Sequence, residues 1–377
     1  MRIGLVAGEA SGDRLGAELI RALRAEVPNA QFDGMAGPQM IAAGCREIAG
    51  IDELSVMGLV EVVRRYPALR RLRSRLIQHF LHAPPDVFIG IDVPDFNLGI
   101  ERALKRRGVS TVHYVCPQVW AWRKSRVKSL RKAADLLLAV FPFEPDYFNG
   151  RGTRASFVGH PLADLLPLDP DVGGARSALG IASDGPLIAI LPGSRQQELD
   201  RLLQPFIEGA AMLRRELPRA HFVLCTAHEE HLDQARRRIA RIDPDFVCTL
   251  VHGDAQRVLT AADAAVVASG TASLEGLLCG TPMVVGYRLA PVTYFIIRRM
   301  VRIPRIAMPN ILAGRELVPE LIQDALEPRV ICRELLAWLN DVDRRADFLA
   351  TSRSLHERMQ CGAAQNAANA VLRLVAS

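Results

Sequence analysis

Short apolar runs alternate with segments of helical spacing along most of the chain. The runs at 2–7, 86–91, 187–191 and 264–268 are rich in Val, Ile, Leu and Ala and are bounded by turn-forming or charged residues, which is typical of buried strands. Between the runs, apolar residues recur at helical spacing at 15–24, 202–216 and 229–241, which predicts helices. Strands that alternate with helices in both halves predict two doubly wound, Rossmann-like parallel sheets facing a central cleft.

The length of 377 residues agrees with this pattern, because it exceeds a usual single core and favours two domains. Pro, Asp and Gly are frequent between residues 165 and 184, which is typical of a linker. We therefore predict an N-terminal domain over residues 1–165 and a C-terminal domain over residues 166–344. A C-terminal helix over residues 345–377 is expected to pack back on the first domain.

Composition places the chain among ordinary globular proteins. Hydrophobic residues make up 49% of it and charged residues 23%, a mix that implies a large buried interior. No apolar run approaches the ~20 residues that a membrane-spanning helix needs. Residues 1–8 lead straight to Glu9 and Asp13 rather than into a signal-peptide cleavage region. We therefore expect a cytoplasmic protein.

The seven cysteines and the net charge of +6 narrow the chemistry further. The cysteines are scattered with no C-x-x-C pair, which argues against a disulfide framework or a structural zinc site. Basic residues gather in three clusters, at 64–75, 123–132 and 298–305. Trp120 and Trp122 stand beside the second cluster, but aromatics interleave with charges nowhere else, so nucleic-acid binding is not supported.

Small residues follow the predicted strand at 264–268. Ser269, Gly270 and Thr271 form a turn that leads into a helix, and the free N–H groups and dipole of a helix start favour a bound phosphate. Glu275, one helical turn further on, is placed to accept hydrogen bonds from a ribose diol. The alternative is that the small residues serve close packing and that Glu275 is a solvated residue.

A similar turn follows the predicted strand at 187–191. Gly193 permits close approach of the backbone, Ser194 follows it, and Arg195 offers a fork of donors that neutralises a diphosphate. The two turns together predict a nucleotide diphosphate site in the second half of the chain.

Carboxylates and hydroxyls end the strands of the first half. Asp92 and Asp95 follow the strand at 86–91, where α/β proteins place their chemistry, and a carboxylate there is suited to take a proton from a sugar hydroxyl. Asp95 is also a candidate helix cap, which leaves Asp92 as the better base, and both are otherwise turn-forming residues. Glu9 and Ser11 follow the first strand and either contact a substrate or, for Ser11, cap a helix.

The segment at 56–81 combines apolar positions at helical spacing with arginines. Such a helix is either part of the core or lies in a membrane interface, where arginines reach lipid phosphates. The segment is apolar on more than one side, which favours membrane or acyl-chain contact. The candidate residues are Val56, Met57, Leu59, Val60, Leu69, Leu72 and Leu76.

Eight motifs, in order, cover nearly the whole chain. They are GEASGD (8–13), VMGLVEV (56–62), GIDVPDFN (90–97), HYVCPQVWAWR (113–123), LPGSRQQE (191–198), ASGTASLE (268–275), MVVGYR (283–288) and PNILAGRELVPELIQ (309–323). Together they closely resemble the lipid-A-disaccharide synthase family. The resemblance implies a GT-B fold and an inverting glycosyltransferase of lipid A biosynthesis.

In that family, UDP-2,3-diacylglucosamine and 2,3-diacylglucosamine 1-phosphate form the β-1,6-linked disaccharide and UDP, without a metal or other cofactor. The absence of a D-x-D pair in a plausible nucleotide loop agrees with metal independence. The resemblance further implies association with the inner-membrane surface and leaves a homodimer open. Two rival functions are a UDP-sugar epimerase of the same fold and a non-catalytic, membrane-peripheral nucleotide-binding protein.

The resemblance also assigns roles to residues. Asp92 would be the base on the acceptor 6-hydroxyl, Arg195 the diphosphate contact and Glu275 the ribose contact. Ser194, Ser269, Gly270, Thr271 and Asn310 would complete the donor site. The role of His160, which ends the first half, stays open between a core or hinge residue and a substrate ligand.

Overall fold

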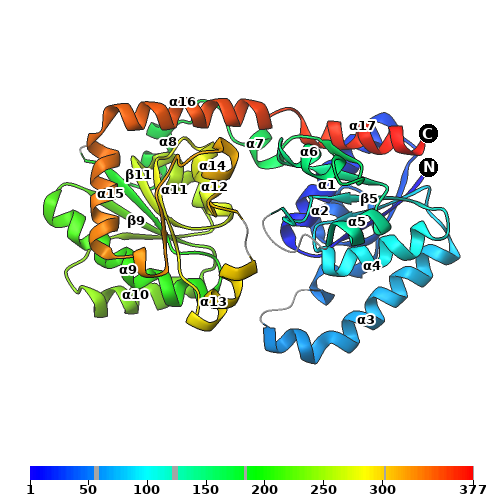
Figure 1. Cartoon of the computed structure of the whole chain (residues 1–377), viewed down its shortest axis with the longest axis horizontal. Coiled ribbons are helices and arrows are strands. Elements are labelled where there is room, and N and C mark those ends of the chain that lie inside the picture. The colour runs from blue at the N-terminus through cyan, green and yellow to red at the C-terminus, as the bar shows by residue number, and fades with distance from the viewer. Residues whose placement is uncertain (55–58, 121–125, 182–184, 301–302, 377) are drawn as a thin grey trace. The chain divides into compact units, whose positions relative to one another are not determined.

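The computed structural model describes residues 1–54, 59–120, 126–181, 185–300 and 303–376 (Figure 1). The chain folds into two compact units. The first holds residues 1–164 together with 358–377, and the second holds residues 165–357. The first unit is therefore built from both ends of the chain.

The first unit contains a seven-stranded sheet in the order β3-β2-β1-β4-β5-β6-β7, and every strand pair in it is parallel. Its strands are β1 (Arg2–Ala7), β2 (Gln31–Ala36), β3 (Cys45–Gly50), β4 (Val87–Ile91), β5 (Ser110–Tyr114), β6 (Leu136–Ala139) and β7 (Ala155–Phe157). The strand order reverses between β1 and β4, so the loops that follow these two strands lie side by side at one edge.

Helices flank this sheet. They are α1 (Ala10–Glu26), α2 (Pro38–Ala42), α3 (Leu59–His82), α4 (Pro94–Lys105), α5 (Arg126–Ala133), α6 (Glu144–Asn149), α7 (Pro161–Leu165) and α17 (Ala363–Val375). One core cluster joins Leu76 and Phe80 of α3 to Phe88 of β4 and Ile100 of α4, all fully buried. The buried strand runs are continuous in hydrophobicity because helices cover the faces of the parallel sheet.

The second unit contains a six-stranded parallel sheet in the order β10-β9-β8-β11-β12-β13. Its strands are β8 (Leu187–Leu191), β9 (His221–Thr226), β10 (Thr249–His252), β11 (Ala264–Ala268), β12 (Met283–Tyr287) and β13 (Glu320–Ile322). Its helices are α8 (Val172–Ala178), α9 (Gln196–Glu216), α10 (Glu230–Ile242), α11 (Ala255–Ala261), α12 (Thr271–Leu278), α13 (Pro291–Met300), α14 (Met308–Ala313), α15 (Pro328–Asn340) and most of α16 (Val342–Met359). β8 and β11 begin and end where the sequence predicts.

The C-terminal segment differs from the single helix predicted over residues 345–377. It forms α16 and α17, which are separated around Gly362 at φ 77°, a left-handed conformation that ends a helix. α17 packs against α1 and buries Ala363, Ala367 and Val371 completely. This last helix therefore completes the first unit (Figure 1).

The lipid contact that the sequence predicts is wrong for two buried residues of α3. Leu72 and Leu76 are 6% and 0% exposed and belong to the core cluster, so they cannot face a bilayer or an acyl chain. Leu69 is half-buried. Val56 and Met57, and the side chains of Leu59 and Val60, lie outside the described residues. Among the described helices, none combines the length and the apolar character that crossing a membrane requires.

Candidate active site

Asp92 lies directly after β4, in a backbone conformation that non-glycine residues rarely adopt. Asp92 has φ 51° and the following Val93 has φ 41° and ψ 59°. For a β-branched residue such as Val93, a positive φ is a genuine outlier, and outliers of this kind persist where function requires them. The turn is fixed by the Asp92 N–H, which donates to the Tyr114 carbonyl of β5 at 2.8 Å.

The side chain of Asn97 in α4 stabilises the same turn through hydrogen bonds. Its buried side-chain amide donates to the carbonyls of Asp92 at 2.8 Å, of Ile91 at 3.2 Å and of Val6 at 3.3 Å. These three contacts tie the end of β4 to β1 and hold the strained turn in place. The signal for Asn97 was present in the GIDVPDFN motif, but sequence reasoning gave this residue no role.

A buried pair lies behind the turn. His113 Nδ1 and Glu101 Oε1 are 2.6 Å apart and both side chains are fully buried. Burial opposes a charge on His113, but the Glu101 carboxylate outweighs it and raises the pKa of the imidazole, with a further contribution from Asp92. A side chain at Gly90 would put a Cβ 2.2 Å from Glu101 Oε1, so glycine is required there. The pair packs under the strand that presents Asp92.

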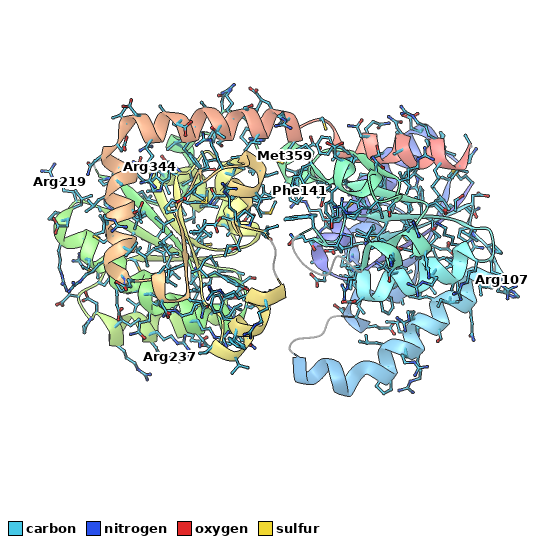
Figure 2. All side chains as sticks on the ribbon, in the orientation of Figure 1. Arg107, Phe141, Arg219, Arg237, Arg344 and Met359 are labelled. Atoms are coloured by element: carbon cyan, nitrogen blue, oxygen red, sulfur yellow. The ribbon has the colours of Figure 1, made fainter. Side chains whose placement is uncertain are left out.

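Asp92 opens into a pocket of 260 Å³ at the carboxyl edge of the first sheet. Its polar lining comes from Asp92, Gln118 and Arg126. The remaining lining is Pro94, Val115, Cys116, Pro117, Val119 and Phe141. Phe141, which is labelled in Figure 2, lies two residues beyond the end of β6. The pocket combines one carboxylate, one guanidinium and apolar walls, which suits an amphipathic, anionic ligand.

The turn after β1 lies next to this one. A Cβ on Gly8 would stand 2.7 Å from Val93 Cγ2, so the two turns are in contact. Glu9 and Ser11 are both exposed; Glu9 is the N-cap residue of α1 without a capping hydrogen bond from its side chain, and Ser11 lies in the first turn of α1. Asp13 is buried and has a different role, since its carboxylate accepts the N–H groups of Gly37, Gln39 and Met40 at 2.9–3.0 Å at the start of α2.

Asp95 does not cap α4, whose N-cap is Val93. Its carboxylate pairs with Arg126 Nη2 at 2.5 Å instead, and 76% of the Asp95 side chain is exposed. Asp92 is therefore the carboxylate that lines the pocket, and Asp95 is not among the lining residues.

Three further residues that the sequence singles out in the first unit are buried or half-buried, and Trp122 lies outside the described residues. Burial raises the pKa of Cys116 well above its usual value, which keeps it a thiol. Trp120 Nε1 donates to buried Glu144 at 3.2 Å. Burial lowers the pKa of His160 to about 4, so its imidazole is neutral, and its Nδ1 accepts the Leu162 N–H at 3.2 Å.

The second unit has its own pocket, of 390 Å³, at the carboxyl edge of its sheet. Seven residues are predicted to bind the nucleotide-sugar donor. Six of them line this pocket, namely Ser194, Arg195, Ser269, Gly270, Thr271 and Glu275. They come from the turns after β8 and β11, which are neighbours in the sheet. Ser269 Oγ donates to the Ile306 carbonyl at 3.3 Å, and Glu275 Oε1 accepts from Gln256 at 3.3 Å.

In the turn after β8, two backbone N–H groups donate to a side chain of α9, the helix that follows. Glu198 Oε2 accepts the N–H groups of Ser194 at 3.0 Å and of Arg195 at 3.2 Å. These two amides are therefore already satisfied within the protein, and the Arg195 side chain is what this turn offers to an anion. The Arg195 side chain remains 82% exposed, with its Nη1 3.7 Å from Glu198 Oε1.

The turn after β11 is open. Gly270 has φ 147° and ψ −148°, and a Cβ built on it would meet no atom within 4 Å. The first N–H groups of an α-helix have no intrahelical partner, so the start of α12 presents donors and a positive dipole end to the pocket. Of the two turns, the start of α12 is therefore the one suited to an anion.

Asn310 is not part of the pocket lining. Its amide is 1% exposed, donates to the Val318 carbonyl and to Glu320 at 2.8 Å each, and accepts the N–H groups of Leu317 and Val318 at 2.7 and 2.8 Å. All of its hydrogen-bonding capacity is used inside the unit. The structure therefore shows Asn310 fixing the loop before β13 and does not place it among the residues that line the pocket.

Thr226, Gly253 and Tyr287 also line the second pocket, and the sequence reasoning missed them. They follow or end β9, β10 and β12, so their position at carboxyl ends of strands was the available signal. Burial raises the pKa of Tyr287, which keeps its hydroxyl protonated as a donor. Over the described residues, no group of His, Cys, Asp and Glu is arranged to hold a metal ion.

Comparison with known proteins gives a consistent result. The family model described as lipid-A-disaccharide synthetase matches residues 3–373. The lipid-A-disaccharide synthase of Sodalis glossinidius is 47% identical over 373 residues, which cover 99% of this chain and 98% of the relative.

Solved structures show the same fold at low identity. The calicheamicin glycosyltransferase CalG4 superposes with a TM-score of 0.61 at 16% identity, covering 100% of this chain and 98% of that one. The UDP-GlcNAc 2-epimerase of Neisseria meningitidis, bound to UDP-GlcNAc, superposes with a TM-score of 0.64 at 11% identity, covering 99% of this chain and 100% of that one. The fold is therefore of the GT-B type and is shared by transferases and epimerases.

Proposed function

The chain belongs to the lipid-A-disaccharide synthase family of lipid A biosynthesis, and we propose that Asp92 is the base with which it activates its acceptor. The observation that carries this proposal is the strained turn that presents Asp92 to the pocket of the first unit. A strained, braced backbone around one carboxylate is expected where the position of that carboxylate decides a reaction rate.

The reaction joins two sugars with inversion. The acceptor 6-hydroxyl oxygen attacks the anomeric carbon of UDP-2,3-diacylglucosamine while its proton passes to Asp92. The bond from that carbon to the diphosphate breaks, and UDP leaves with the electron pair. A positioned general base contributes about 10²- to 10⁴-fold to such a step.

The departing diphosphate needs stabilisation of its negative charge. In this proposal the start of α12, with Gly270, Ser269 and Thr271, receives the diphosphate, and the exposed Arg195 guanidinium adds a mobile cation. Glu275 accepts the ribose hydroxyls, and Ser194 contributes a hydroxyl at the rim. These groups need no metal to act.

The rival function in the same fold is a UDP-sugar epimerase, in line with the likeness to the Neisseria enzyme. An epimerase processes its nucleotide sugar without an acceptor. A non-catalytic nucleotide-binding protein would bind UDP and form no disaccharide. UDP release that depends strictly on the lipid acceptor, with formation of the disaccharide, separates the proposed reaction from both.

The direct test replaces Asp92 by Asn. We expect Asp92→Asn to lower kcat by about 10³-fold, because the amide cannot take the proton, while UDP binding is unchanged. Turnover is measured with both diacyl sugars, and UDP binding is measured by calorimetry.

The matched control is Asp146→Asn, the same chemical change at an exposed carboxylate of α6 outside the pocket. It should turn over like the parent protein. An Asp92→Asn variant that keeps its rate, or one that loses UDP binding together with turnover, would contradict the assignment of Asp92 as the base.

We further propose that the protein lies at the cytoplasmic surface of the inner membrane and that α13 contributes to this contact. Val292 and Phe295 of α13 are 72% and 59% exposed, and the Arg299 guanidinium lies 3.6 Å from the Phe295 ring centroid. Exposed Arg70, Arg71 and Arg75 of α3 add positive charge for anionic headgroups.

Co-sedimentation with vesicles that contain an anionic phospholipid tests this contact. The double variant Val292→Ser/Phe295→Ser should lose several-fold in bound fraction without a change in melting temperature, because both side chains are exposed. Val247→Ser, at a 73% exposed apolar residue outside any helix or strand, is the control and should bind normally. Equal binding of all three proteins would remove α13 from the membrane contact.

A further inference from the structure

Arg126 shares a pocket with the proposed base. It is the first residue of α5, and it lines the same 260 Å³ cavity as Asp92. It is the only cation among the residues described as lining that cavity. One side of the pocket therefore carries a proton acceptor and another carries a positive charge.

The present partner of Arg126 is a weak one. Arg126 Nη2 contacts Asp95 Oδ1 at 2.5 Å, but the Asp95 side chain is 76% exposed while that of Arg126 is only 25% exposed. An ion pair with a solvated carboxylate adds little free energy, since water competes for the carboxylate. An incoming anion with more charge can displace Asp95, which then returns to solvent without loss of a buried contact.

The chemistry of the Arg126 side chain also favours an anion. The planar fork of a guanidinium matches the oxygens of a phosphate in a bidentate way, which a lysine cannot do. Asp95 occupies the place of that anion in the free protein.

The acceptor of the reaction offers such an anion. It is a single sugar ring that carries the reacting 6-hydroxyl and an anomeric phosphate, so a hydroxyl at Asp92 brings the phosphate into the same cavity. We propose that Arg126 binds the anomeric phosphate of the acceptor and makes the enzyme selective for a phosphorylated over an unphosphorylated acceptor. This inference rests on the proposed function of Asp92.

The first experiment compares two acceptors with the full-length protein. These are 2,3-diacylglucosamine 1-phosphate and the same sugar with a free anomeric hydroxyl, both in the same detergent. We expect Arg126→Ala to lower kcat/KM for the phosphorylated acceptor by about 10- to 100-fold, the size of a charged hydrogen bond, with the loss mainly in KM. Activity toward the unphosphorylated acceptor should stay the same.

Two further variants sharpen the result. Arg126→Lys keeps the charge but not the fork, so it should recover only part of the selectivity. Lys128→Ala removes one positive charge from an exposed position of the same helix and should leave both activities at the parent level. An equal loss on both acceptors in Arg126→Ala, or no loss on either, would overturn the inference.

The second experiment does not depend on turnover. In the Asp92→Asn background, the dissociation constant of each acceptor is measured with and without Arg126→Ala. The phosphorylated acceptor should bind about 10- to 100-fold more weakly when Arg126 is removed, and the unphosphorylated acceptor should bind equally in both proteins. Equal effects on the two acceptors contradict the phosphate contact while leaving the base assignment intact. If Asp92→Asn itself turns over normally, the proposed function fails instead.

Discussion

The two pockets use positive backbone φ angles in opposite ways. At the pocket of the first unit, positive φ occurs at Asp92 and Val115, which line it, and at Val93, which follows Asp92; all three residues carry side chains. In the second unit, the pocket-lining residues with positive φ are Gly193, Gly253 and Gly270, which have none. One pocket forces side chains into an unfavourable conformation, and the other removes the side chain so that the same kind of conformation costs little.

The difference follows from what each pocket must present. In the proposed reaction a base acts through its own side chain, so the first unit would hold a carboxylate at a fixed point, and strain of about 1–3 kcal/mol at each such residue is compensated by the surrounding fold. In the same proposal the diphosphate is bound by backbone N–H groups, so the second unit would let a ligand approach the main chain closely. We therefore expect substitutions at the first pocket to lower kcat and substitutions at the second pocket to weaken UDP binding.

Among changes that act through the backbone of the two pockets, the largest effect is expected at Gly270. A methyl group there would meet no protein atom within 4 Å, so Gly270→Ala should fold, but its Cβ would project into the proposed diphosphate site. The backbone conformation is also unfavourable for alanine. We expect kcat/KM for the donor to fall by about 100-fold, mainly through KM, with weaker UDP binding by calorimetry.

Gly314→Ala is the control for Gly270. Gly314 has φ 68° and a Cβ there also meets nothing within 4 Å, but it follows α14 outside the pocket. It should lose some stability and keep its affinity for UDP. If Gly314→Ala weakens UDP binding as much as Gly270→Ala does, the effect comes from backbone strain and not from the pocket.

A smaller effect is expected from the brace of the first pocket. Asn97→Ala removes the donor to three carbonyls and frees the Asp92 turn to relax, so kcat should fall by about 10-fold. UDP affinity should not change, because the second unit is untouched. Asn149→Ala, at an amide that bonds the N–H and the carbonyl of Ala155, is the control and should cost stability without lowering kcat. A loss of UDP affinity in Asn97→Ala would show that the pockets are not independent.

The smallest expected effect is a pH dependence of folding stability, which arises at Glu144 next to the pocket of the first unit. Glu144 accepts the N–H groups of Trp120 and Phe141, and burial raises its pKa from 4.5 to about 7. The folded protein therefore binds this proton more tightly than the unfolded chain does. The associated stability is complete below pH 4.5 and is lost as the pH rises through about 7.

The variant Glu144→Gln resembles the protonated acid at every pH. Its melting temperature should equal that of the parent near pH 4 and exceed it by a few degrees at pH 8, as thermal unfolding across this range would show. Because other groups titrate alike in both proteins, the difference isolates Glu144. A difference that stays constant from pH 4 to pH 8 would contradict a raised pKa.

Local patterns predicted most of the fold and the turns, because strands and their carboxyl-end loops depend on neighbouring residues. β8 and β11 lie as predicted, and the six small or charged residues of their turns meet in one pocket. The helical spacing of Leu72 and Leu76 was also read correctly, but spacing does not say whether the apolar face meets lipid or the core of the unit.

The differences concern contacts between residues distant in sequence or choices between hydrogen-bond partners. Asn310 turns inward because Leu317, Val318 and Glu320 fold around it, which the motif alone does not reveal. Glu198 satisfies the Ser194 and Arg195 amides in the turn after β8, a turn that the sequence marks as part of a diphosphate site. In each case a polar group that looked available for a ligand is satisfied within the protein.

The packing of α17 on α1 has a consequence for synthesis on the ribosome. The first 164 residues emerge early, but the helix that covers α1 emerges last, after the whole of residues 165–357. At about 5–20 residues per second, the interval is on the order of 10 to 40 seconds. During that time α1 exposes the apolar surface against which Ala363, Ala367 and Val371 of α17 later pack. A chain that is released before α17 is made would keep this surface exposed.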